Sequence, residues 1–452
     1  MRHGERSPVS PRFQNAGLAP FWPYCNAARF FTSAIMSQKD WSEHTMLPFQ
    51  RRLETFGRDD LPVPATGPNG ETHGICQPGE LTDVGRQTTL ALGERLRRLY
   101  VEQLSFLPAQ IENADAFYLR TTPIPRALES MQQAFTGMYP PGTRAADFPP
   151  PPIITRSPAD ETLFPNDSNC RRFAHLSRAF AQRAAERWND TPEMEYLNKV
   201  LGKWMPAESK RIAVDSRPRL SGIMDTINAT AVHGPETKLP KEFYDPQAAE
   251  IIDKVAMEEW YAGYGESREY RALGIGALAG DMVGRMVGNS TGELGATRFA
   301  ISGCHDTTLA GFLSGLGAFD GEKWPPFTSH IAVELLRVKK DAAPEASKST
   351  GWFGLFGKKS TSLPVRKRSE ELTDDERAKL DGYFVRVRYN DRVMTVPGCR
   401  KEGNHREGDE SLCTLSAFKA IVDKFTPLDW KAECSANVKG PAFPPERQPA
   451  GY

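Results

Sequence analysis

Short apolar runs that lead directly into helical patterns constrain the fold of this chain more than any other feature of its sequence. Residues 116–119 form one such run, which ends at Arg120 and is followed by a helical pattern over 128–138. Residues 298–303 form a second run, which passes into Cys304-His305-Asp306 and then into another helix. Buried strands that alternate with helices are typical of α/β proteins. The sequence therefore predicts an α/β sheet protein.

The chain divides into five segments by pattern. Residues 1–160 are predicted as the first part of an α/β core, in which 9–75 form a long Pro- and Gly-rich excursion with one short helix, and a helix capped by Thr82 runs to about Tyr100. Residues 161–295 have mostly helical periodicity and are predicted as a cap or insert. The core continues over 296–338, a basic insert over 339–375 is expected to be disordered, and 376–452 complete the core. Residues 332–336 and 384–389 are predicted as adjacent strands.

The charge of the chain is unevenly distributed. Its 57 basic and 57 acidic residues balance, which excludes a dedicated nucleic-acid binder. Residues 339–368 carry eight basic and two acidic residues, a net charge of +6, so the rest of the chain carries −6. Two hypotheses remain for this insert. A disordered surface loop is favoured, and the alternative is contact of Trp352–Phe356 and the neighbouring lysines with an anionic membrane surface.

The compartment is left open by the sequence. No apolar run is long enough to span a bilayer, and the chain shows no signal peptide before Arg2. Seven cysteines occur without a C-x-x-C pair, Cys399 and Cys413 are the closest in sequence, and the odd number leaves one thiol unpaired. Sequons at Asn166, Asn189, Asn228 and Asn289 favour a secretory route weakly. A secretory route and a mitochondrial route therefore both remain as hypotheses for the compartment.

Three polar clusters carry the chemistry. Arg2, His3 and Arg6 lie within five residues beside Gly4, and arginine binds phosphate oxygens through bidentate hydrogen bonds. His305-Asp306 follows a predicted strand, where α/β sheets place ligand sites, and Arg120 ends another. Each cluster alone has an ordinary reading: a solvated basic terminus, a helix cap, a surface arginine. Together they predict an anion site, since such a concentration of cations is unfavourable without one.

These residues resemble the histidine acid phosphatase family, clade two of the histidine phosphatase superfamily. The signature R-H-G-x-R-x-P is matched at 2–8, the distal pair at His305-Asp306, the Arg-Ser/Thr-Thr element at 120–122 with Arg126 following, and a Gly-x-Leu-Thr-x-x-Gly element at 79–85. The resemblance implies a mainly parallel central sheet flanked by helices, as in phosphoglycerate mutases, with a helical cap. It also implies an acid phosphatase that hydrolyses phosphate monoesters through a phosphohistidine.

The resemblance assigns a role to each candidate residue. His3 would be the nucleophile and Asp306 the proton donor, while Arg2, Arg6, Arg120 and His305 would bind the phosphate. No metal or other cofactor is implied. The alternative hypothesis is a non-catalytic phosphate-binding protein or a truncated gene model: Met1 precedes Arg2 directly, with no apolar strand ahead of it, so His3 would sit on a mobile chain end.

Within that family, the sequence resembles the mitochondrial lysophosphatidic acid phosphatase branch. The similarity rests on the segments at 91–97, 126–130, 163–166, 317–320, 323–327 and 396–399. It implies a lysophospholipid substrate, for which residues 223–227 could line an apolar groove or be ordinary core. Sugar phosphates, inositol phosphates and phosphoproteins remain alternatives. The sequence leaves the oligomeric state undetermined.

Overall fold

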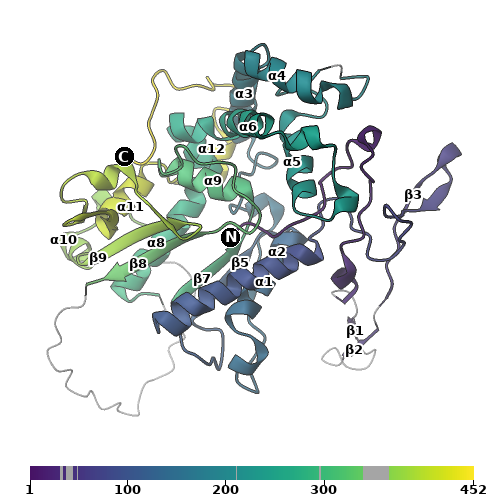
Figure 1. Cartoon of the computed structure of the whole chain (residues 1–452). Coiled ribbons are helices and arrows are strands. Elements are labelled where there is room, and N and C mark those ends of the chain that lie inside the picture. Colours follow the sequence, from purple (N-terminus) through teal and green to yellow (C-terminus); the bar gives the residue numbers. More distant parts are fainter. Residues whose placement is uncertain (31–33, 37–43, 48, 210, 295–296, 339–365) are drawn as a thin grey trace.

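The computed structural model describes residues 1–30, 34–36, 44–47, 49–209, 211–294, 297–338 and 366–452 (Figure 1). The N-terminus lies near the middle of the molecule, beside the strand ends and α9 (Figure 1). This position brings the first residues of the chain to the same place as elements from its second half.

A three-stranded parallel sheet forms the centre of the first core. β5 (Phe117–Thr121) lies between β6 (Ile153–Ile154) and β7 (Phe299–Gly303), with Leu119 opposite Ile301. α1 (Asp83–Arg97) packs on α2 (Pro125–Met138), and apolar side chains of α2 share a core with β5 and β7. α1 begins where Thr82 Oγ1 accepts a hydrogen bond from the Gly85 N–H (3.3 Å). The parallel sheet flanked by helices confirms the predicted fold class.

A second sheet is antiparallel. β8 (Ile331–Arg337) and β9 (Tyr383–Tyr389), the two strands predicted as adjacent, pair along their whole length. β9 also pairs with β10 (Arg392–Met394) and β12 (Asp409–Thr414), and β12 pairs with β11 (His405–Arg406). The second core joins this sheet to α9 (Asp306–Gly315) and α11 (Leu415–Asp423). α12 (Trp430–Ser435) follows near the C-terminus.

The predicted insert over 339–375 can be compared with the structure only at its C-terminal end. Residues 339–365 lie outside the described part, but 366–375 are ordered, so the prediction is wrong there. Lys419 Nζ donates to Lys367 O (2.6 Å), and the Ser369 N–H donates to Asp423 Oδ2 (2.8 Å). α10 (Asp374–Ala378) starts at a Thr373 cap. The buried Lys419–Asp423 pair holds this segment because buried charges require hydrogen-bond partners.

Helices dominate the middle of the chain, as predicted. They are α3 (Arg171–Trp188), α4 (Pro192–Leu201), α5 (Leu220–Ala231), α6 (Pro246–Glu266), α7 (Arg268–Arg271) and α8 (Ala277–Thr291). α4, α5 and the N-terminal half of α6 build a separate apolar core, to which Ile223 of α5 belongs. Residue 223 is therefore core, one of the two readings that the sequence left open for 223–227.

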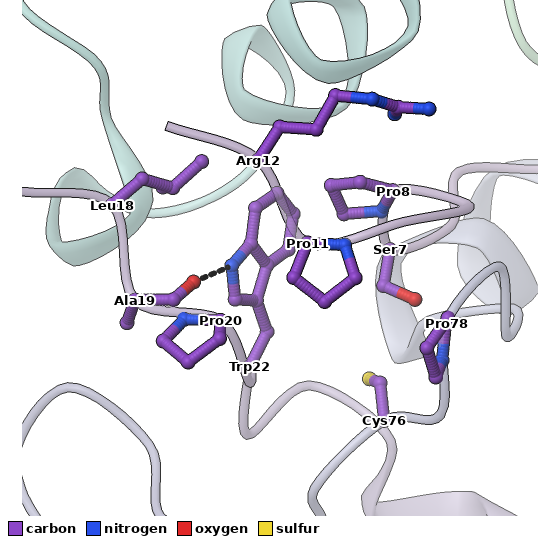
Figure 2. A pocket seen from close by; sticks show the side chains of 10 residues that line it. All are labelled: Ser7, Pro8, Pro11, Arg12, Leu18, Ala19, Pro20, Trp22, Cys76 and Pro78. Carbon is purple, nitrogen blue, oxygen red and sulfur yellow. Dashed lines mark hydrogen bonds between the residues drawn. The ribbon is translucent and has the colours of Figure 1, made fainter. Parts of the chain in front are cut away.

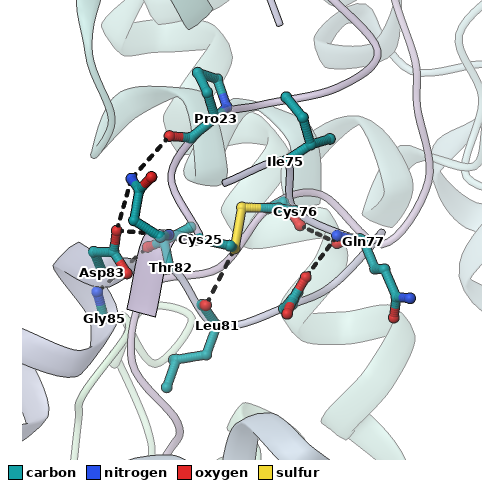
Figure 3. The surroundings of a disulfide bond; sticks show 12 residues. Pro23, Cys25, Ile75, Cys76, Gln77, Leu81, Thr82, Asp83 and Gly85 are labelled. Atoms are coloured by element: carbon teal, nitrogen blue, oxygen red, sulfur yellow. Dashed lines mark hydrogen bonds between the residues drawn. A yellow bond between two sulfur atoms is a disulfide. The ribbon is translucent and has the colours of Figure 1, made fainter. Parts of the chain in front are cut away.

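The N-terminal excursion differs from its prediction. The described parts contain two pairs of short antiparallel strands, β1 (Ala34–Met36) with β2 (His44–Met46) and β3 (Glu54–Phe56) with β4 (Pro62–Pro64), together with short 3₁₀ turns. The Cys25–Cys76 disulfide joins the two ends of this excursion next to Leu81 and Thr82, at the start of α1 (Figure 3). The disulfide thus stabilises a segment that has few apolar residues with which to form a hydrophobic core.

Six of the seven cysteines are paired. The Cys399–Cys413 pair that the sequence singled out is formed, Cys170–Cys434 ties the start of α3 to α12, and Cys304 is the buried free thiol. Among the helices of the described residues, none has the length and apolar character needed to cross a membrane.

Candidate active site

Residues 1–7 run through the protein interior at the carboxyl end of β7. The His3 N–H donates to Cys304 O (3.0 Å) on one side, and the Arg2 N–H donates to Ser329 O (2.8 Å) on the other. The His3 side chain is only 2% exposed. The idea that His3 sits on a mobile chain end is therefore wrong, because the segment has backbone partners from two elements.

The two glycine-containing motifs meet at this point. A Cβ on Gly4 would lie 2.3 Å from Gly85 O, and a Cβ on Gly85 would lie 2.2 Å from Glu5 O. The Thr82 N–H and Oγ1–H both donate to Glu5 O (3.0 and 3.1 Å). Only glycine at both positions permits this close approach of backbone to backbone. The approach fixes where His3 and Arg6, on either side of Gly4 and Glu5, emerge.

The tautomer of His3 is set by its neighbour. Nδ1 lies 2.9 Å from Gly4 O, and because a carbonyl only accepts, Nδ1 carries the proton. The lone pair is then on Nε2. Burial lowers the pKa of His3 well below its usual range, and the positive charges of Arg126, Arg2 and Arg6 lower it further. The ring is therefore neutral under acidic conditions.

His305 and Asp306 lie beside this ring. The His3 and His305 ring centroids are 5.4 Å apart, His305 Nε2 is 3.1 Å from Thr122 Oγ1, and burial lowers the pKa of His305 to about 3. Asp306 Oδ2 pairs with Arg2 Nη2 (2.8 Å) and accepts from Trp324 Nε1 (3.0 Å). Arg2, Arg6 and this indole outweigh burial and lower the pKa of Asp306.

The side chains of Arg2 and Arg6 both lie over the ring of Phe327. Their guanidinium carbons lie 4.2 and 5.6 Å from the centroid of Phe327. Arg6 Nη2 pairs with Asp225 Oδ1 of α5 (2.7 Å), a contact that the sequence did not predict. The ring of Phe327 therefore contributes a cation–π interaction to both arginines.

Arg120 does not face His3 in the manner predicted. It is the penultimate residue of β5, close to the strand end that the sequence predicted, and its guanidinium pairs with the fully buried Glu161 (2.7 Å) and, at 3.8 Å, with Asp281 of α8. The strand alternates its side chains between two faces, and Arg120 points to the face that carries those carboxylates. Its charge is thus already compensated within the protein.

Arg126 is the arginine that sequence reasoning passed over. It lies in the first turn of α2, just beyond the end of β5, and Nη1 donates to Gly79 O (3.3 Å). Burial and the nearby Arg6 lower the pKa of Arg126 to about 10, and Arg126 is the cation that most lowers the pKa of His3. The sequence did contain a signal for this position. Pro125 is the first residue of α2, and a proline at that place marks where the helix begins, directly before Arg126.

A shallow pocket adjoins the site. Its wall contains Ser7, Pro8, Arg12 and Trp22, whose Nε1 donates to Ala19 O (3.0 Å) (Figure 2). Its empty volume, including the part open to solvent, is about 310 Å³.

Comparison with known proteins identifies the family of this chain. The profile of the histidine phosphatase superfamily (branch 2) matches residues 1–390. A probable acid phosphatase of Schizosaccharomyces pombe is 36% identical over 440 residues, covering 96% of this chain and 92% of its own. A protein of Bos taurus named lysophosphatidic acid phosphatase type 6 is 27% identical over 354 residues, covering 75% and 73%. The crystal structure of a Klebsiella phytase aligns over 95% of both chains with a TM-score of 0.51 at 14% identity, a likeness of fold alone.

Proposed function

Since the chain belongs to branch 2 of the histidine phosphatase superfamily and is a histidine acid phosphatase, we propose that it hydrolyses phosphate monoesters through a phosphohistidine at His3. One observation carries the proposal. A neutral imidazole, with its Nδ1–H donated to Gly4 O and its Nε2 lone pair available, lies among Arg2, Arg6 and Arg126. Such a ring is a nucleophile in a field that binds an anion.

Each step of the reaction has a group to perform it. His3 Nε2 attacks phosphorus as the bond from phosphorus to the ester oxygen breaks, and the protonated Asp306 carboxyl gives its proton to that oxygen. Water then attacks the phosphohistidine, Asp306 takes a proton from the water, and the N–P bond breaks to release phosphate and restore His3. Asp306 acts first as acid and then as base.

Phosphate binding falls to a revised set of residues. Arg2, Arg6 and His305 keep the roles that the sequence implied, because their charges or rings lie around His3. Arg126 takes the role first given to Arg120. Supporting this exchange, Arg120 is paired with Glu161, while the described residues place no carboxylate within 4 Å of Arg126. An arginine without an internal counter-ion is the better ligand for a phosphate dianion.

For the substrate we propose lysophosphatidic acid as the first compound to test. Support comes from relatives that carry the name lysophosphatidic acid phosphatase and from the sequence segments shared with that branch. A lysophospholipid requires an apolar surface near the site for its acyl chain. A panel that also contains glycerol, sugar and inositol phosphates tests this choice directly.

The purified chain, its His3→Ala variant and a His405→Ala control test the catalytic proposal. His405 lies in β11 and bonds to Cys399 O, outside the site. We expect the wild type and the control to hydrolyse p-nitrophenyl phosphate and to yield an acid-labile phosphoprotein on quenching, and His3→Ala to do neither. Activity retained in His3→Ala contradicts the nucleophile. Phosphate binding without turnover in the wild type favours the non-catalytic alternative.

A further inference from the structure

Asp306 is bordered by aromatic side chains that no step of the proposed reaction uses for binding. The indole Nε1–H of Trp324 donates to Asp306 Oδ2 (3.0 Å). The centroid of the half-buried Trp324 ring lies 5.1 Å from that of Tyr261 and 6.0 Å from that of Trp260, which it meets edge to face at 88°. Trp260 lies on α6 and is 41% exposed. One indole thus contacts the proposed acid, and the indole beside it is open to solvent.

Both indoles are held in place by α6. The Trp324 N–H donates to Asp253 Oδ1 (2.8 Å) of that helix. Asp253 and Trp260 are seven positions apart, and residues with this spacing lie on the same face of a helix. α6 packs in turn against α9, whose first residue is Asp306. The two rings therefore form a fixed apolar surface next to the helix that carries the acid.

The geometry of phosphoryl transfer sets where the alcohol part of the substrate lies. The attacking and the leaving atoms are roughly in line, on opposite sides of phosphorus. With His3 as nucleophile, the ester oxygen is on the far side and within reach of Asp306, so the alcohol extends from Asp306 away from His3. Arg2 and Trp324 both bind Asp306 Oδ2. Because Arg2 is a proposed phosphate ligand, Trp324 is the neighbour that remains for the alcohol.

Resting on the proposed function above, we propose that Trp324 and Trp260 form the subsite for the alcohol and select alcohols that carry an apolar chain. Tryptophan offers a large apolar surface, on which an alkyl or acyl chain loses contact with water. A sugar ring would need hydrogen-bond partners for its hydroxyl groups, and the carboxylate of Asp253 beside Trp324 already accepts a backbone N–H. The subsite therefore favours a chain over a sugar.

A series of straight-chain alkyl phosphates from ethyl to octyl tests the proposal, because the acidity of the leaving alcohol stays nearly constant along it. We expect wild-type kcat/KM to rise about twofold for each added CH₂ group, against about fourfold for complete burial, since the indoles cover only one side of the chain. In Trp260→Ser the rise should fall below about 1.3-fold for each CH₂ group. Trp260→Phe keeps an aromatic ring and should retain most of the wild-type rise.

Two further variants separate substrate binding from structure. Phe443→Ser is a matched control, because Phe443 is also 41% exposed but packs on Phe180 of α3, and it should keep the wild-type dependence on chain length. Trp324→Phe removes the N–H that binds Asp306 but keeps a ring, so the pH profile of kcat should move while the dependence on chain length persists. A purely structural role for the tryptophans predicts an equal loss on every ester, with the dependence on chain length unchanged.

The outcomes distinguish this inference from the proposed function. A wild type that hydrolyses no phosphate monoester overturns both. An active wild type whose kcat/KM does not depend on chain length overturns the subsite alone, and so does a dependence that persists in Trp260→Ser. A loss in Trp260→Ser that is confined to glucose 6-phosphate and myo-inositol 1-phosphate overturns the choice of an apolar chain. A dependence lost in Trp260→Ser and kept in Trp260→Phe and Phe443→Ser supports the proposal.

Discussion

Replacing Arg126 and Arg120 by Gln, one at a time, separates an arginine that binds substrate from an arginine that supports the fold. The two residues lie six positions apart, on β5 and at the start of α2. Arg120 pairs with Glu161, whose side chain is 0% exposed, whereas the guanidinium of Arg126 donates to a backbone carbonyl, that of Gly79. The same substitution should therefore have opposite consequences at the two positions.

The magnitudes follow from these environments. Loss of one charged donor to the reacting phosphoryl group costs about 2.7–4 kcal/mol, or about 10²–10³ in kcat/KM, and this is the expectation for Arg126→Gln. Arg120→Gln leaves the buried Glu161 carboxylate without its counter-ion, although the Thr162 and Leu163 N–H groups still donate to it. Loss of one partner of a buried ion pair costs about 3–5 kcal/mol of unfolding free energy. The folded fraction of this variant should keep kcat/KM within about threefold of the wild type.

The pH profile supplies an independent reading. Arg126 is the cation that most lowers the pKa of His3, so its removal raises that pKa and should move the acidic limb of kcat/KM to higher pH. Thermal midpoints and kcat/KM–pH profiles of both variants on p-nitrophenyl phosphate provide the measurement. A large kinetic loss with an unchanged midpoint in Arg120→Gln, together with near-normal kinetics in Arg126→Gln, would refute the exchange of roles.

Three further changes have distinct expected results. Gly4→Ala places a methyl group 2.3 Å from Gly85 O. We expect thermal melting to show a loss of about 1–3 kcal/mol in stability and steady-state kinetics to show a kcat at least about 10²-fold lower. Normal kinetics would contradict the close approach of the two backbones. Trp324→Phe removes an N–H that stabilises the Asp306 carboxylate, so the pKa of that acid rises and the basic limb of kcat moves to higher pH, whereas a shift to lower pH opposes the assignment. Cys170→Ser removes the disulfide to Cys434, which lies 264 residues further along the chain. We expect the free energy of unfolding, measured by denaturant titration, to fall by up to about 5 kcal/mol. An unchanged value would mean that the bond does not form.

Local patterns were enough to predict the framework of the site. The apolar run before Arg120 and the run before Cys304 became β5 and β7, and the spacing after Thr82 became α1. Strands and helices of this kind can be predicted from the periodicity of their apolar residues, and the carboxyl ends of parallel strands meet at one edge of the sheet. His3, His305 and Asp306 could be brought together from the sequence for that reason.

The counter-ions could not be predicted in this way. Whether Arg120 faces the site depends on which side of β5 carries Glu161, and whether Arg6 is free depends on Asp225 of α5. Both partners come from distant parts of the chain, so no local pattern connects them to their arginines. The choice between Arg120 and Arg126 is decided by tertiary pairing, which the motif does not contain.

The protonation states that the reaction requires run against ordinary values. The nucleophile must be neutral while the acid is protonated, yet ordinary pKa values of about 6.5 and 3.9 put that combination in at most about one molecule in 400, at a pH midway between them. Burial and the cluster of arginines lower the pKa of His3, which removes the deficit on the histidine side. The same arginines lower the pKa of Asp306 in the free protein, so they worsen the deficit on the carboxyl side. A phosphate dianion that arrives with the substrate brings two negative charges to the arginines, which favours the protonated form of Asp306 without removing any of the cations around Nε2. The arginines that keep the nucleophile neutral therefore depend on the bound substrate to protonate the acid.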